Sequence, residues 1–123
     1  MRSVGSILAA LMLLAMAIVA AAAPLSLTVV KAEASTDMVT GQPVVSITFD
    51  AASKEAFAAF TQDNVGKVTV VRIDGEEIMR PIIQEPILEG SVMIHGNMTM
   101  ASARDLAARL SAGDAIFEVE VIE

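Results

Sequence analysis

The segment MIHGNMTM gathers three methionines around the single histidine of the chain. Thioether and imidazole groups are ligands for soft ions such as Cu(I). Strand alternation before Gly96 would place Met93 and His95 on one face. The competing interpretation is that these methionines fill gaps in a hydrophobic core. Both interpretations stay open, and the candidate soft-metal ligands are Met93, His95, Met98 and Met100.

Acid–base or nucleophilic catalysis has little support in this sequence. The chain has no Cys, and the carboxylates near His95 do not stand at a spacing that predicts a catalytic triad. Asp74, Glu76 and Glu77 could share acid–base work, but they fall at a predicted hairpin tip, where water would surround them. Lys67 follows a predicted helix C-terminus, which is the wrong end of the helix dipole for a phosphate. We therefore expect a protein that is not an enzyme and needs no cofactor.

The N-terminus predicts export from the cytoplasm. Residues 7–23 read ILAALMLLAMAIVAAAA, an apolar run without a charge that ends in small residues before Pro24. This is the pattern of a secretory signal peptide, expected here over residues 1–22 and followed by a single domain over residues 23–123. The alternative is that the segment is retained as an inner-membrane anchor. The net charge of −7 argues against binding nucleic acid or anionic lipid, because both need clustered Lys and Arg.

The hydrophobic pattern of the mature chain predicts strands and two helices in the order β-β-α-β-β-β-α-β. The first helix can be capped by Asp50 or by Ser53, the second is capped by Thr99, and the two helices end before Gly66 and Gly113. Such an order is typical of a two-layer α+β sandwich, with a mostly antiparallel sheet and both helices on one face. Strands are expected at residues 25–30, 44–49, 68–73, 77–83, 91–95 and 116–122, and residues 31–43 are expected to form a loop or a sheet edge.

Three separated motifs resemble the head subdomain of the first large periplasmic domain of SecD, a subunit of the bacterial preprotein translocase. They read FTQDNVGK, VRIDGEEIMRPIIQEPI and IHGNMTMASARDLAARLSAG, and the resemblance covers residues 43–115. Met98 departs from the family, which has an aromatic residue there. The residues that match the family and that we expect to have structural roles are Phe60, Asn64, Gly66, Lys67, Asp74, Gly75, Glu85, Pro86, Gly96, Thr99 and Gly113.

The resemblance implies a periplasmic domain with an affinity for unfolded polypeptide or for an envelope protein partner, in protein export or envelope quality control. We expect no proton-driven work, because the multi-helix membrane region of SecD has no counterpart in this sequence. We expect membrane contact only through an uncleaved signal segment. A proline in the strand expected at 77–83 marks that strand as an edge, and an unpaired edge can accept an added strand. The predicted contact residues are Ile78, Met79, Pro81, Ile82 and Ile83.

Overall fold

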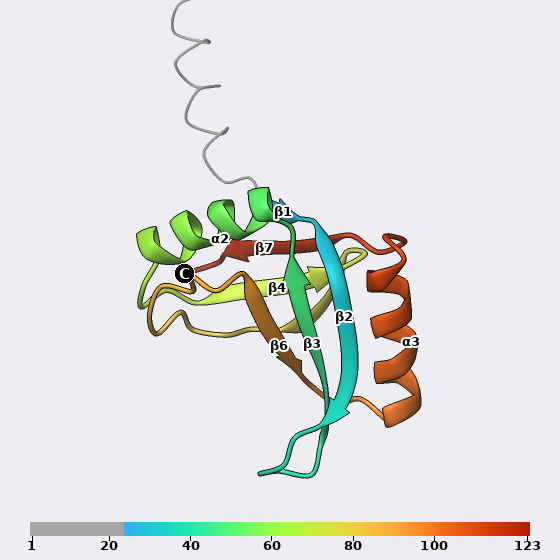
Figure 1. Ribbon diagram of the computed structural model, residues 1–123. Coiled ribbons are helices and arrows are strands. Elements are labelled where there is room, and N and C mark those ends of the chain that lie inside the picture. The colour runs from blue at the N-terminus through green and yellow to red at the C-terminus, as the bar shows by residue number, and fades with distance from the viewer. Residues whose placement is uncertain (1–23) are drawn as a thin grey trace, which may run out of the picture.

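The computed structural model describes residues 24–123 of the chain, shown in colour in Figure 1. The predicted signal peptide over residues 1–22 lies outside the described residues. Within residues 24–123, no helix is both long enough and apolar enough to cross a membrane.

The described chain forms antiparallel strands and two helices, as the sequence predicts for an α+β fold. A four-stranded sheet has the order β1-β7-β4-β5, and a three-stranded sheet has the order β2-β3-β6. The strands of the two sheets run in crossing directions in Figure 1. The elements are β1 (Leu25–Leu27), β2 (Val29–Thr36), β3 (Pro43–Phe49), α2 (Ala51–Asp63), β4 (Thr69–Ile73), β5 (Glu76–Met79), β6 (Ser91–His95), α3 (Met100–Ser111) and β7 (Phe117–Val121).

The presence of two sheets, where the sequence pattern led us to expect one, has a local cause at Thr28. The backbone N–H of Thr28 donates to Ser53 Oγ at 2.8 Å, and its carbonyl accepts from Asp50 N at 3.0 Å. Both backbone groups are therefore bonded to the start of α2 rather than to a neighbouring strand. The strand expected at 25–30 is divided there, so that β1 pairs with β7 and β2 pairs with β3.

Two expected boundaries were wrong. The first part of the segment predicted as a loop or an edge at residues 31–43 belongs to the strand β2, whose polar and small residues pair along β3 as far as Thr36 with Pro43. Only the turn around residues 37–42 remains, and it projects from the lower end of the molecule in Figure 1. The strand expected at 77–83 ends at Met79 instead, and beyond it Ile82 makes one isolated bridge to Val68.

Of the two residues that could cap the first helix, Asp50 does so, and Thr99 caps the second as predicted. Asp50 accepts a hydrogen bond from Ser53 N at 2.8 Å, and Thr99 forms a reciprocal capping box with Ser102. The helix α3 packs on β2 and β3, whereas α2 contacts β1. Each helix therefore covers a different sheet.

One hydrophobic core joins the two sheets and both helices. At its centre, the ring of Phe49 on β3 packs edge-to-face against Phe57 on α2 and Phe117 on β7, with ring centroids 5.4 and 5.3 Å apart. Such aromatic contacts add about 0.5–1.5 kcal/mol each beyond the burial of their area. The layers are thus held together by aromatic packing between elements that are distant in the sequence.

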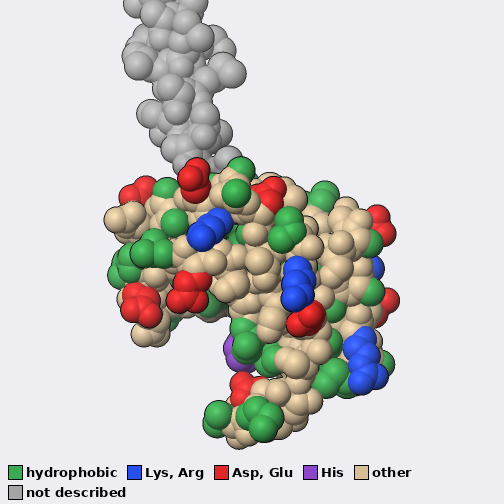
Figure 2. All heavy atoms as spheres, viewed as in Figure 1, with side chains coloured by type: hydrophobic (Ala, Val, Ile, Leu, Met, Phe, Trp, Pro, Cys, Tyr) green, Lys and Arg blue, Asp and Glu red, His purple; other side chains and the backbone are tan. Residues whose placement is uncertain are grey.

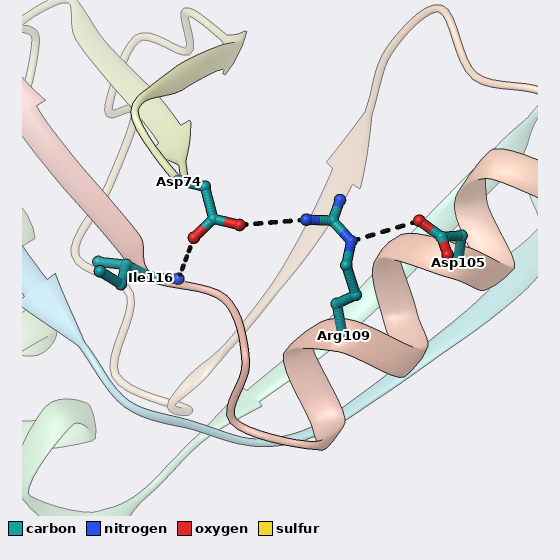
Figure 3. A network of polar contacts seen from close by, with 4 residues as sticks. All are labelled: Asp74, Asp105, Arg109 and Ile116. Atoms are coloured by element: carbon teal, nitrogen blue, oxygen red, sulfur yellow. Dashed lines mark hydrogen bonds and ion pairs between the residues drawn. The ribbon is translucent and has the colours of Figure 1, made fainter.

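The turn between β4 and β5 is the predicted Asp-Gly hairpin, and a polar network holds it (Figure 3). Asp74 adopts a left-handed backbone with a φ of 53°. One of its carboxylate oxygens accepts from Ile116 N at 2.8 Å, and the other accepts from Arg109 Nη1 at 3.1 Å. Arg109 also reaches Asp105 at 3.3 Å. Asp74 therefore ties the turn to α3 and to the start of β7, and its carboxylate has a structural role.

Candidate functional site

An apolar groove of about 440 Å³ lies between α2, the four-stranded sheet and β6. Its floor contains Phe57 and Phe60, whose rings stack with centroids 6.3 Å apart. Two sheet strands complete the floor with Val71, Phe117 and Val119. One wall is the irregular segment of residues 81–89, here called the strap, and the other is the strand β6.

The strap is attached to the rest of the fold through two buried threonines. Thr61 on α2 is fully buried, and its Oγ1 accepts from Ile87 N at 2.9 Å while it donates to Phe57 O at 2.9 Å. Thr69 on β4 donates to Pro81 O twice, from its backbone N at 2.9 Å and from its Oγ1 at 2.8 Å. These contacts hold the strap at a fixed distance from the groove floor, so the groove is part of the folded structure.

The ends of the strap are also bound to neighbouring elements. Ile83 N donates to Lys67 O at 3.1 Å, and Ile83 O accepts from Gly66 N at 2.7 Å. The positive φ of Gly66, 85°, lets the chain turn after α2 and reach this contact. At the far end, Gly90 O accepts from Phe49 N at 2.9 Å. The predicted helix-ending residue Gly66 therefore also fixes one wall of the groove.

Apolar side chains remain partly exposed in the groove, and its charged lining is acidic. Ile82 is 53% exposed, Leu88 is 60% exposed and Met93 is 45% exposed. Among the lining residues, Glu85 and Glu89 carry charge and none is Lys or Arg. In Figure 2, acidic, basic and apolar side chains lie next to one another at the end of the molecule where α2 and the strap are found. The groove is thus suited to apolar side chains accompanied by positive charge.

Most of the predicted contact residues lie at this groove. The groove is lined by Met79, Pro81, Ile82 and Ile83. The side chain of Ile83 is buried, and its backbone groups bond to Gly66 and Lys67. Ile78 does not line the groove and packs against the core. The sequence reasoning missed the other wall, formed by Ser91, Val92 and Met93, and it also missed Leu88.

The residues expected to have structural roles lie at helix ends, at turns and in the strap. Asn64 caps the C-terminus of α2, and its Nδ2 donates to Phe60 O at 2.8 Å. Glu85 and Pro86 lie in the strap. Gly96 follows β6, where a Cβ atom would lie 3.7 Å from the carbonyl oxygen of Ile78. Gly75 and Gly113 adopt positive φ values of 81° and 79° at their turns, and Lys67 accepts from Ile83 N through its backbone.

The candidate metal ligands are only partly brought together. Met93 and His95 lie exposed on one side of β6, as strand alternation predicts. Met98 packs against the hydrophobic core, and Met100 begins α3. Residues 24–123 contain no group of three or more His, Cys, Asp or Glu side chains that could hold a metal ion. The soft-metal hypothesis stays a prediction that now depends on Met93 and His95.

The carboxylate of Glu77 at the hairpin forms an ion pair with Arg80. The Arg80 guanidinium lowers the pKa of Glu77 by donating hydrogen bonds to both carboxylate oxygens, at 2.7 and 2.8 Å. A lowered pKa keeps the carboxyl group ionised at neutral pH, which is unsuitable for a general acid. Together with the role of Asp74 in the turn, this arrangement directs attention to the groove rather than to the hairpin tip.

Comparison with known proteins relates both the sequence and the fold to a single family. The family model described as SecDF, P1 head subdomain, matches residues 16–115. The protein translocase subunit SecD of Dictyoglomus turgidum is 42% identical over 83 residues, which are 68% of this chain and 21% of the relative. The corresponding subunit of Rickettsia bellii is 37% identical over 82 residues, 67% of this chain and 16% of the relative. The chain thus spans about a fifth or less of the length of these relatives.

Two solved structures of SecDF share the fold. One, of a membrane component SecDF that enhances protein export, has a TM-score of 0.66 and 30% sequence identity, covering 70% of this chain and 39% of that one. The other, SecDF in a super-membrane-facing form, has a TM-score of 0.66 and 29% identity, covering 77% of this chain and 13% of that one. The fold described above is therefore similar to a part of these larger proteins.

Proposed function

The chain belongs to the SecDF P1 head subdomain family, and on that premise we propose that it binds unfolded polypeptide in its apolar groove during protein export. The observation that carries this proposal is the groove itself, with a floor of aromatic and aliphatic side chains and exposed Ile82, Leu88 and Met93 around it. The relatives named as translocase subunits, and the related SecDF described as enhancing protein export, support the link to export.

The proposed mechanism is passive capture, without an enzymatic step. An unfolded chain carries apolar side chains that are hydrated, and their transfer into the groove removes apolar surface from water. Burial of two aliphatic side chains would contribute about 3–6 kcal/mol. The loss of translational and rotational freedom and the ordering of the bound segment offset much of that gain. Binding would therefore be weak and reversible, which suits a protein that must release its client.

The proposed location is the periplasm. Family membership and the apolar N-terminal run support this location, with the periplasmic face of the inner membrane as the alternative if that run is retained. Cell fractionation of the full chain tests the proposal directly. Recovery in the periplasmic extract or in the inner membrane fits one of the two locations, and recovery in the cytosol contradicts both.

The function is tested by following the aggregation of the insulin B chain after reduction with dithiothreitol. The reductant leaves this protein unchanged because the chain has no Cys. We expect light scattering to fall as the protein is added in excess. If the protein neither suppresses aggregation nor binds the reduced B chain at high concentration, the proposal is wrong.

A pair of matched variants assigns the effect to the groove. Leu88→Glu places a charge at an exposed aliphatic side chain in the groove, and Val39→Glu places the same charge at the 93%-exposed Val39 in the β2–β3 turn. We expect Leu88→Glu to weaken suppression about tenfold, because about 1.4 kcal/mol of apolar contact is lost. Val39→Glu should act like the wild type. Equal effects of the two variants would show that the groove is not the binding site.

A further inference from the structure

The strand β6 has one edge that is not hydrogen-bonded to another strand, although β5 lies near its C-terminal end. It is the terminal strand of the β2-β3-β6 sheet and pairs only with β3 among the described residues. Phe49 N donates to Gly90 O, and Gly90 stands one residue before β6. This bond determines which residues of β6 are hydrogen-bonded to β3. Hydrogen-bonded pairs alternate in an antiparallel ladder, so Val92 and Ile94 bond to β3. The backbone N–H and C=O groups that point outward are those of Ser91, Met93 and His95.

The opposite edge of the same sheet is covered. Ala32 on β2 donates from its backbone N to Ser111 Oγ at 3.0 Å, and its carbonyl accepts from the same hydroxyl at 3.0 Å. The helix α3 therefore satisfies the outward groups in the middle of β2. Protein folds commonly protect an edge strand in this way against pairing with another chain. Within residues 24–123, no hydrogen bond of this kind is formed along the outer edge of β6.

The groove runs along this edge of β6. Ser91, Val92 and Met93 all line it, although successive side chains of a strand point to opposite faces of the sheet. Contact with three consecutive residues places the groove beside the backbone at the beginning of β6. An extended segment in the groove would therefore lie next to the outward backbone groups of Ser91 and Met93.

The charge of the lining indicates which segments fit. Glu85 and Glu89 contribute negative charge, no lining residue is basic, and the whole chain carries a net charge of −7. Complementary charge raises the rate of encounter and disfavours acidic partners. We propose, as a refinement that depends on the proposed function, that an extended polypeptide segment with apolar and basic side chains pairs with the outer edge of β6 as a fourth strand of this sheet.

The probe is a capped octapeptide in which valine and lysine alternate, labelled with a fluorophore. Strict alternation fixes which side chains enter the groove, because a shift of one residue would exchange the two faces. Two N-methylated versions carry the methyl groups either on two inner valines or on two inner lysines. The amide N–H groups of only one of these sets point toward β6, and N-methylation removes a donor from each modified residue.

Fluorescence anisotropy measures the binding of the three peptides to the wild-type protein. Strand pairing predicts that one N-methylated peptide binds about 25-fold more weakly than the parent, as expected for two lost hydrogen bonds, while the other stays within about threefold. If both N-methylated peptides bind like the parent, or are weakened equally, strand pairing is wrong although the groove binds peptide. If the parent octapeptide and the reduced insulin B chain both fail to bind, the proposed function itself is wrong.

A charge control uses the octapeptide in which valine alternates with glutamate. We expect it to bind at least tenfold more weakly than the lysine peptide at low salt, with the difference reduced at high salt because salt screens exposed charges. Equal binding of the two peptides would overturn the preference for basic segments.

A protein variant tests the same edge without altering the peptide. Met93→Pro removes an N–H that points away from β3, so the hydrogen bonds between β6 and β3 are kept. Proline is tolerated on an edge strand where the N–H faces away from the sheet. Met93→Ala removes the side chain but retains the N–H. With circular dichroism showing both variants folded, Met93→Pro should weaken the lysine octapeptide at least fivefold more than Met93→Ala. Equal affinities of the two folded variants would contradict pairing at Met93.

Discussion

The hydroxyl of Thr61 is predicted to control the position of the strap, and Thr61→Val removes that hydroxyl while nearly preserving the shape of the side chain. Thr61 is fully buried, and its Oγ1 is the acceptor for Ile87 N at 2.9 Å. The variant leaves this N–H without its partner. The carbonyl of Phe57, which also contacts the hydroxyl, keeps its hydrogen bond within the helix.

The size of the effect follows from that one unpaired group. A donor left unsatisfied in a partly buried position costs about 1–3 kcal/mol, so we expect Thr61→Val to lower the free energy of unfolding by about 2 kcal/mol. For a domain of this size, such a loss lowers the melting temperature by about 8–16 °C. The strap should also separate from α2, with faster hydrogen exchange at the amide of Ile87 and weaker peptide binding.

Urea unfolding followed by far-ultraviolet circular dichroism is the suitable assay, because the chain has no Trp or Tyr for fluorescence. The matched control is Thr48→Val, which makes the same change at an exposed position of β3 and should change the stability by less than about 0.5 kcal/mol. If Thr61→Val is as stable as Thr48→Val and the exchange rate of Ile87 is unchanged, the assigned role of Thr61 is refuted.

Two further predictions concern polar contacts of the β4–β5 hairpin. Asp74→Asn tolerates the left-handed backbone and can still accept from a backbone N–H, but it loses the ion pair with Arg109, so urea unfolding should show a loss of at most about 1 kcal/mol. Asp74→Ala loses both acceptors and the residue type suited to positive φ, and it should cost about 2 kcal/mol or more. An NMR titration should show the pKa of the Glu77 carboxyl group below the ordinary value of a glutamate, because the Arg80 guanidinium lowers it.

The direction of the pKa shift of Glu77 determines the pH range in which this carboxyl group stabilises the fold. A carboxyl group whose pKa is lower in the folded state stabilises the fold above its unfolded-state pKa, and this contribution is lost as the pH falls through the folded-state pKa. Because Glu77 and Arg80 are exposed, the change in stability at acidic pH should be small. Arg80→Gln should return the titration of Glu77 to the ordinary range of a glutamate. An unchanged Glu77 titration in that variant, or equal stabilities of Asp74→Asn and Asp74→Ala, would contradict these assignments.

Local chemistry explains which parts of the fold could be predicted from the sequence. Asp50 and Thr99 cap helices, and the Asp74-Gly75 pair forms a hairpin turn, because each role depends on neighbours within a few residues. The strand β2 was missed because its residues after Val30 are polar or small. Its conformation depends on pairing with β3 rather than on its own propensity.

Contacts between distant residues explain the remaining differences. The division into two sheets occurs at Thr28, which bonds to Ser53 on α2, and the strands β2 and β3 lie between these two residues in the sequence. The groove combines α2, four strands and the strap, so no single pattern in the sequence marks it. Met79, Pro81 and Ile82 could be proposed because apolar residues surround a proline at a strand end. The wall formed by β6 could not be predicted from the sequence, because its position at a sheet edge depends on the order of all the strands.

The most direct test of the central claim is an NMR titration of the ¹⁵N-labelled protein with the alternating valine–lysine octapeptide. We predict that the largest chemical-shift changes occur at the amides of β6 and of the strap, residues 91–95 and 81–89, and that they reach saturation. Within this set, the outward amides of Ser91 and Met93 should shift downfield as they gain hydrogen-bond acceptors. Shift changes confined to other surfaces, or no change at millimolar peptide, would contradict the assignment of the groove as a polypeptide-binding site.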